Sequence, residues 1–297
     1  MSDSLVRYRS DEEDSARWWN FPFRPDDIVI STRSKSGTTW VQMICALLVF
    51  QTSELPERLD TLSPWLHWLV SPRDEVVSRL QTQTHRRFIK THTPLDGVPH
   101  HPGVTYIVVG RHPLDMAVSL YHQGSNLDRG RVRELIGNGT ATAGHEDIGS
   151  RPGLTEWLKS WIAWDGPPRE RLDSLLGIMW HLSDAWARRE RGNVLLVHYD
   201  DLAENLEGEM RRLAARLGLV VSDDRWPELV DAATFDAMRD RADRLPPGSV
   251  LKDRTKFFRR GSSGAGAEAL SAADIAVYEE RAHQLAPPDL VTWLHRK

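Results

Sequence analysis

Residues 26–40 have the sequence DDIVISTRSKSGTTW, and the prediction of the fold starts from them. Residues 28–30 form a β-branched run, which is typical of a buried parallel strand. A short loop of small, hydroxyl-bearing residues follows, and the mostly apolar residues 38–50 are predicted to form a helix. A strand, such a loop and a helix N-terminus together bind anions, because free backbone N–H groups and the helix dipole point at one place. The stretch therefore predicts an anion site on this loop.

The loop carries its own charge and donors. Lys35 adds a positive charge, and Ser36, Thr38 and Thr39 add hydroxyl groups. An ordinary βα turn with a capping serine is the simpler alternative, and the concentration of lysine, glycine and threonine disfavours it. The loop is not a Walker A sequence, since that motif places its lysine directly after the second glycine, whereas Lys35 comes two residues before Gly37. A simple P-loop kinase is disfavoured, but a phosphate-like ligand is not.

The run Lys-Ser-Gly-Thr-Thr-Trp resembles the 5′-phosphosulfate loop of the cytosolic sulfotransferases, with Ser34 where that family usually has proline. This family transfers sulfonate from 3′-phosphoadenylyl sulfate (PAPS) to an acceptor hydroxyl or amine. The resemblance implies that PAPS is the co-substrate. It also implies that the loop residues hold the phosphosulfate and that the following tryptophan flanks adenine: Lys35, Ser36, Gly37, Thr38, Thr39 and Trp40.

Residues 86–95, RRFIKTHTPL, form the second informative stretch. Phe88 and Ile89 begin a short strand, and alternation puts Lys90 and His92 on the same side of it. Ligands of open α/β sheets bind at the carboxyl ends of the strands. The pattern resembles the Lys-Thr-His-x-Pro-Leu segment of the sulfotransferases, which implies that His92 is the catalytic base. By hypothesis, Lys35 and Lys90 stabilise the leaving oxygen.

Residues 104–111 are the clearest strand, and a helix is predicted directly after it. Arg111 stands where the two meet, and Ser119 follows at the spacing of the family's 3′-phosphate segment, Arg-x-x-x-Asp-x-x-x-Ser. This resemblance implies that both residues bind the 3′-phosphate. The alternative is a strand-end arginine that pairs with a carboxylate such as Asp115.

Three later segments extend the resemblance. The strand near residues 193–202 ends in a Tyr-Asp-Asp cluster, and residues 232–238 resemble a segment whose phenylalanine stacks on adenine. Residues 257–261 resemble the Arg-Lys-Gly run that closes over the 3′-phosphate. The nucleotide-binding residues implied here are Tyr199, Thr234, Phe235, Arg259, Arg260 and Gly261, with Ala233 where the family has threonine.

Together these segments predict an α/β fold, a single P-loop-like domain over residues 1–297 with a central parallel sheet flanked by helices. Residues 124–153 show little periodicity and are predicted to be an inserted loop or lid. The family's C-terminal dimer motif is not visible, so the oligomeric state stays open. Residues 154–191 are predicted to be helical, with a break at Pro167 and Pro168.

The composition and charge of the chain argue against several classes of function. The net charge of −4 argues against non-specific binding of nucleic acid, and no run is long and apolar enough to span a bilayer. Cys45 is the only cysteine, and residues 1–13 contain no signal-peptide apolar region. A cytoplasmic location is therefore expected. No cluster of Cys and His ligands is present, so no metal is expected.

The acceptor side is less defined. Residues 56–72 combine three prolines with Trp65 and Trp68, which suggests a small, apolar alcohol or phenol as acceptor. Packing of these tryptophans in the core is an equal alternative. Two other functions stay open, a small-molecule P-loop kinase that needs Mg²⁺ and a non-catalytic protein that binds PAPS or another nucleotide.

Overall fold

The computed structural model describes residues 5–137, 151–245 and 250–296. Its centre is one sheet of four parallel strands in the order β2-β1-β3-β4. The strands are β1 (Ile28–Ser31), β2 (Phe88–Thr91), β3 (Thr105–Gly110) and β4 (Val194–His198). The strands and sheet therefore confirm the predicted α/β class. The prediction of a single domain over residues 1–297 stays a prediction.

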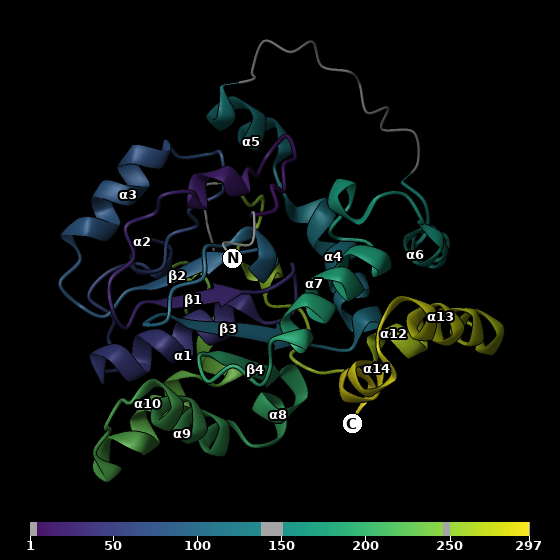
Figure 1. Cartoon of the computed structure of the whole chain (residues 1–297). Helices are drawn as coiled ribbons and strands as arrows, with labels where there is room; N and C mark the ends of the chain where they lie inside the picture. The colour runs from purple at the N-terminus through teal and green to yellow at the C-terminus, as the bar shows by residue number, and fades with distance from the viewer. Residues whose placement is uncertain (1–4, 138–150, 246–249, 297) are drawn as a thin grey trace.

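Helices cover both faces of the sheet (Figure 1). The α-helices are α1 (Thr38–Phe50), α2 (Leu59–Leu62), α3 (Arg73–Thr82), α4 (Pro113–Asn126), α5 (Arg129–Ile136), α6 (Leu154–Ala163), α7 (Leu175–Ala187), α8 (Tyr199–Glu204), α9 (Leu206–Leu217), α10 (Trp226–Ala232), α11 (Phe235–Asp240), α12 (Ala265–Glu268), α13 (Ala272–Leu285) and α14 (Pro288–His295). Short 3₁₀ turns are η1 (Ser15–Trp18), η2 (Leu95–Gly97), η3 (Pro168–Glu170), η4 (Asp223–Arg225) and η5 (Thr255–Phe257).

The core lies in two layers because side chains alternate along each strand. Ile28 and Ile30 pack with α1, α9 and α10 on one face. Val29 packs with α4, α6, α7 and α14 on the other face. Both faces are apolar, so the strands are buried and the chemistry is confined to the ends of the sheet.

A buried ion pair closes the end where the strands begin, which we call the amino end of the sheet. Asp27 directly precedes β1 and Arg87 directly precedes β2, and each is 1% exposed. The Nε atom of Arg87 donates to Oδ1 of Asp27 at 2.7 Å, and Nη2 donates to Oδ2. The opposite end, where the strands finish, we call the carboxyl end.

The prediction of a loop over residues 124–153 is wrong for residues 124–136, which lie mostly in two helices. Helix α4 continues to Asn126, whose side-chain amide donates to the carbonyl of Asp253 at 2.7 Å and whose Oδ1 accepts from the Asp253 N–H. Helix α5 follows, and the Asp128 side chain caps it by accepting from the Arg131 N–H. Tertiary contacts and a cap thus override a composition poor in helix formers. The remainder of that prediction, residues 138–150, lies outside the described residues.

One other boundary differs from the sequence prediction. The strand predicted over residues 193–202 ends at His198, because its side chain accepts from the Asp200 N–H and starts α8. The helical region over residues 154–191 is confirmed, with its break at η3.

Candidate active site

One cavity of about 870 Å³ lies at the carboxyl end of the sheet. Fourteen of the sixteen predicted site residues line it: Lys35, Gly37, Thr38, Thr39, Trp40, Lys90, His92, Arg111, Ser119, Tyr199, Phe235, Arg259, Arg260 and Gly261. They come from segments far apart in the sequence. The fold therefore brings the separately recognised motifs around a single space.

The loop before α1 has the backbone shape of an anion cradle. Lys35 and Gly37 both adopt left-handed conformations, with φ of 66° and 106°. Gly37 is the N-cap of α1 and no side chain of the described residues caps this helix, so the first N–H groups of the helix are available to a ligand. A Cβ atom on Gly37 would lie 3.0 Å from the Tyr199 ring, which also favours glycine there.

Two predicted site residues do not line the cavity among the described residues. The Ser36 hydroxyl is fully buried and donates to the carbonyl of Arg33 at 2.7 Å, so it stabilises the loop from inside. Thr234 is the N-cap of α11, where its hydroxyl accepts from the Ala237 N–H. Trp40 donates through Nε1 to the Ala233 carbonyl at 2.8 Å, so this segment contributes its backbone rather than its hydroxyl.

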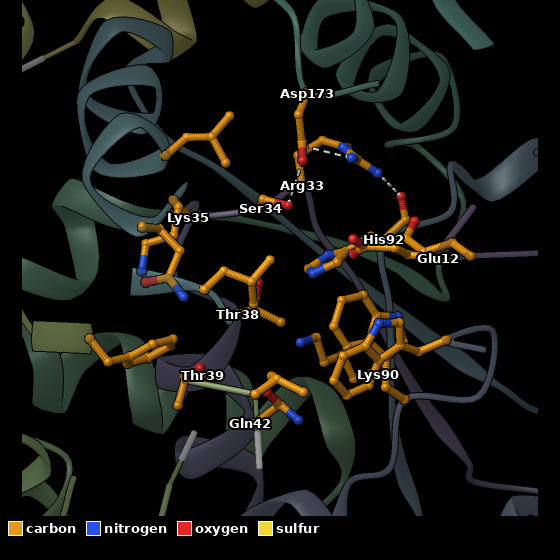
Figure 2. Close-up of a pocket in the computed structure, with 18 of the residues that line it drawn as sticks. Glu12, Arg33, Ser34, Lys35, Thr38, Thr39, Gln42, Lys90, His92 and Asp173 are labelled. Carbon is orange, nitrogen blue, oxygen red and sulfur yellow. Dashed lines mark hydrogen bonds and ion pairs between the residues drawn. The ribbon is translucent and has the colours of Figure 1, made fainter. Parts of the chain in front are cut away.

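Two lysines bring positive charge into the cavity (Figure 2). Burial, and after it the charges of Arg111, Lys90 and Arg259, lowers the pKa of Lys35 to about 7. Burial also lowers the pKa of Lys90 to about 8. The Nζ atom of Lys35 lies 4.2 Å from the Phe257 ring centre, and that of Lys90 lies 3.7 Å from the Trp65 ring centre. Within the residues that the structure describes, neither lysine forms an ion pair.

His92 is held as a neutral base. Its Nδ1 atom contacts the carbonyl oxygen of Thr32. Because a carbonyl can only accept, Nδ1 carries the proton and Nε2 keeps its lone pair. Burial, and after it the charge of Lys90, holds the pKa of His92 well below its usual value. The Trp65 ring packs edge-to-face on the imidazole, with centres 4.6 Å apart.

A second cationic group in the cavity lies next to the anion loop. Arg111 is 8% exposed, and its guanidinium lies 3.9 Å from the Tyr199 ring centre. It donates to the carbonyls of Lys35 and Ser262, at 3.2 and 3.4 Å, and its buried Nε has no hydrogen-bond partner among the described residues. The alternative of an Arg111–Asp115 pair is wrong, because the Asp115 carboxylate accepts the N–H groups at residues 264 and 266.

The segment after η5 closes this part of the cavity. Gly261 has a φ of 67°, and a Cβ atom there would lie 2.6 Å from the Phe235 ring. Arg259 and Arg260 precede it, and Arg260 pairs with Glu268 at 2.8 Å. This segment thus brings an aromatic ring and two arginines to one cavity.

Several lining residues were missed by sequence reasoning. Arg33 is 3% exposed, and Nη1 donates to the backbone carbonyl of His92. Its Nη2 pairs with Asp173 at 2.6 Å. The signal for Arg33 was its place directly before the anion loop. Asp173 carries no sequence signal, because the chain returns to the site from a distant segment.

The remaining wall combines aromatic and charged side chains. Trp65 and Trp68 stack with ring centres 4.7 Å apart. Further charged residues that line the cavity include Arg9, Asp11, Glu12, Glu13, Arg58, Asp60, Arg79, Arg129, Arg169, Glu170 and Arg171. Stacked tryptophans with acids and arginines are suited to a ligand that has both apolar faces and hydroxyl groups.

The described residues contain neither a metal-binding cluster nor a membrane-spanning helix. No group of three or more His, Cys, Asp or Glu side chains is arranged there to hold a metal ion. None of the helices in the described ranges has the length and apolar character needed to cross a bilayer.

Residues 25–286 match the family described as the sulfotransferase domain. The glycolipid sulfotransferases of Mycobacterium bovis and Mycobacterium tuberculosis are each 40% identical to this chain, over 99% of it and 95% of their own lengths. Dog sulfotransferase 1B1 is 25% identical over 82% of this chain and 78% of its own.

Two solved structures are similar in fold, each with a TM-score of 0.68 and 19% identity. One is retinol dehydratase in complex with retinol and PAP, which covers 91% of this chain and 84% of its own. The other is mouse sulfotransferase SULT7A1 complexed with PAP, covering 94% and 92%. At this identity the likeness shows the fold alone.

Proposed function

This chain belongs to the sulfotransferase family and is a sulfotransferase, and from that premise we propose that it moves sulfonate from PAPS to a hydroxyl group of a glycolipid-type acceptor, with His92 as base. The observation that carries the proposal is the Nδ1 contact of His92, which leaves Nε2 without a hydrogen bond to any described residue, in a cavity that Lys35, Lys90 and Arg111 also line. The mycobacterial relatives named as glycolipid sulfotransferases support the acceptor class.

The cavity fits a nucleotide with two separated anionic groups. The N–H groups at the start of α1, with Lys35, Thr38 and Thr39, hold the 5′-phosphosulfate. Arg111, Ser119, Arg259 and Arg260 hold the 3′-phosphate, and Trp40 and Phe235 flank the adenine. That the two similar structures contain PAP supports this arrangement. No metal takes part in the proposed chemistry.

In the transfer, the acceptor oxygen bonds to sulfur, the bond from sulfur to the bridging phosphate oxygen breaks, and the hydroxyl proton passes to Nε2 of His92. Negative charge grows on the bridging oxygen as it leaves. Lys35 and Lys90 stabilise that charge, and they act strongly because both are partly withdrawn from water.

The acceptor wall favours a hydroxyl-rich headgroup over the apolar alcohol or phenol predicted from sequence. The stacked Trp65 and Trp68 offer a face to a sugar ring, and the charged rim offers hydrogen bonds to its hydroxyl groups. The kinase and the nucleotide sensor that the sequence left open are disfavoured by the family and by the position of Lys35. A cytoplasmic location and the oligomeric state stay predictions.

The test is transfer of labelled sulfonate from PAPS to a panel of neutral glycolipids, with simple phenols and aliphatic alcohols alongside. We expect the glycolipids to be the better acceptors. His92→Ala should lower kcat by at least about 10²-fold while PAP binds with nearly unchanged affinity. His283→Ala, which changes an exposed histidine on α13, is the matched control. Full activity of His92→Ala would overturn the base assignment, and preference for phenols would overturn the acceptor class.

A further inference from the structure

Arg33 is a buried cation that joins three parts of the site. It lies between β1 and the anion loop, and its Nη1 donates to the His92 carbonyl while its Nη2 pairs with Asp173 at 2.6 Å. The next residue, Ser34, donates its hydroxyl to the second carboxylate oxygen of Asp173 at 2.9 Å. Figure 2 shows this set of contacts above the cavity.

Asp173 is itself fixed in place. Its backbone carbonyl accepts from Nε1 of Trp161 at 2.6 Å, and Ser174 after it caps α7. Asp173 also follows Arg169 and Arg171, which line the acceptor side of the cavity. The carboxylate therefore ties the acceptor rim to the loop that binds the anion.

The same loop holds His92 at two points. Thr32 accepts from Nδ1 of the imidazole, and the neighbouring Arg33 donates to the peptide carbonyl of the same histidine. With the ring nitrogen and the peptide both fixed, the imidazole has one orientation relative to the cavity. A burial of 97% is costly for an arginine unless it serves such a set of contacts.

We propose that Arg33, held by Asp173, is a positioning residue that fixes the backbone of His92 so that Nδ1 stays on the Thr32 carbonyl, and that links this arrangement to the acceptor rim. This inference rests on the proposed function, since it assigns Arg33 a role through the base. Arg33 touches neither the acceptor nor the nucleotide in this role. The family resemblance gives no such role to this position.

The charges around His92 set its pKa, which the pH dependence of the rate reports. A residue that only stabilised the fold would not change this pKa. The imidazole is faced by Lys90 from β2, Arg33 from the loop after β1, Glu13 from the N-terminal segment and His67 from the segment before α3. Lys90 and Arg33 lower the pKa of His92, and Glu13 raises it. Removing the charge of Arg33 should therefore raise the pKa of His92.

The experiment compares the whole enzyme with Arg33→Gln, Asp173→Asn and the double variant. For Arg33→Gln we expect kcat to fall about 10- to 100-fold, with PAP affinity within about threefold of the original. In a plot of kcat/KM for the acceptor against pH, at saturating PAPS, the acidic limb of Arg33→Gln should lie at higher pH than that of the original enzyme. Asp173→Asn should lower kcat by a smaller factor, and the double variant should be no worse than Arg33→Gln, because the two residues act as one unit.

Two further measurements separate positioning from folding. Asp184→Asn breaks an ion pair between Asp184 on α7 and Arg188, the residue that follows this helix, and should leave kcat and the pH profile unchanged. Nitrogen NMR of the His92 ring should show Nδ1–H alone in the original enzyme and a mixture of tautomers in Arg33→Gln, without any need for turnover. Arg33→Lys, which keeps the charge but loses the second donor arm, should restore the pH limb and not the rate.

The inference would be overturned if folded Arg33→Gln kept its kcat, if the limb did not move, or if the two single effects added. A loss of PAP affinity parallel to kcat would instead make Arg33 a nucleotide ligand, and would also overturn it. Failure of the proposed function is seen separately, as full activity of His92→Ala.

Discussion

The two ends of the sheet differ in whether their buried cations have carboxylate partners among the described residues. At the amino end, Arg87 gives two hydrogen bonds to Asp27 and further ones to the carbonyls of Pro22 and Leu80, so its charge is matched within the protein. At the carboxyl end, Lys35 and Lys90 lie in the cavity with no carboxylate partner among the described residues. Burial holds the pKa of both lysines below the usual value.

This difference separates charges that stabilise the fold from charges that serve a ligand. A paired buried ion contributes to the uniqueness of the fold and is costly to break. An unpaired buried cation destabilises the free protein and regains that energy when an anion binds. Under the proposed function, the carboxyl end would bind a doubly anionic nucleotide at the expense of stability.

The largest expected effect is the loss of a cation from the carboxyl end. Lys35→Met should lower kcat by about 10²- to 10⁴-fold, because one preorganised charge at the leaving oxygen is lost. The same change should raise the melting temperature of the free protein, since a desolvated ammonium is replaced by an apolar chain. Initial rates and thermal unfolding measure the two effects. Lys159→Met, at an exposed pair with Asp274, is the control and should change neither. A less stable variant with normal kcat would reverse the assignment of this end.

The opposite result is expected at the amino end. Asp27→Asn should lower the free energy of unfolding by about 3–5 kcal/mol, because it leaves Arg87 buried without its counter-charge. The folded fraction should keep its kcat and its PAP affinity. Urea denaturation measures the stability, and rates per folded molecule measure the activity. If kcat of Asp27→Asn fell even at a low temperature at which the variant stays folded, the amino and carboxyl ends of the sheet would not be independent.

The sequence predicted residues that line the cavity where a motif lies within one continuous segment of the chain. Lys35, Gly37 and Thr38 lie in one loop between a strand and a helix, so local pattern placed them. Arg111 was also found, because its strand end is marked by the helix that follows. Asp173 was missed because its contact with Arg33 spans 140 residues, and no local period reports such a contact. Ser36 and Thr234 were assigned to the ligand because a hydroxyl in a motif does not reveal which way it points.

Nucleotide affinity should depend on pH through the two lysines. Below pH 7 both are protonated in the free protein, whereas above pH 7 to 8 a bound anion must draw protons onto them. The affinity for PAP should therefore fall as pH rises through this range, by up to about tenfold per pH unit for each lysine. Calorimetry in two buffers of different ionisation enthalpy would measure both the affinity and the proton uptake. Affinity that stays flat from pH 6.5 to 9 would mean that neither lysine meets the anion.

The smallest expected effect is on the stability of the free protein between pH 7 and 8.5. The folded pKa values of Lys35 and Lys90, about 7 and about 8, lie below the unfolded value of about 10.4, so the unfolded chain binds more protons across this window. Stability should therefore rise with pH here, whereas below pH 7 the full cost of burying both charges remains. Above pH 8.5 the Cys45 thiol opposes the rise, because burial raises its pKa to about 12.

Urea denaturation at pH 7.0 and 8.5 would measure the slope of stability against pH. This slope should flatten in Lys35→Met and in the presence of PAP but persist in Asp27→Asn. A slope unaffected by PAP would mean that the rise comes from groups outside the anion site, and the contrast between the two ends would then rest on rates alone.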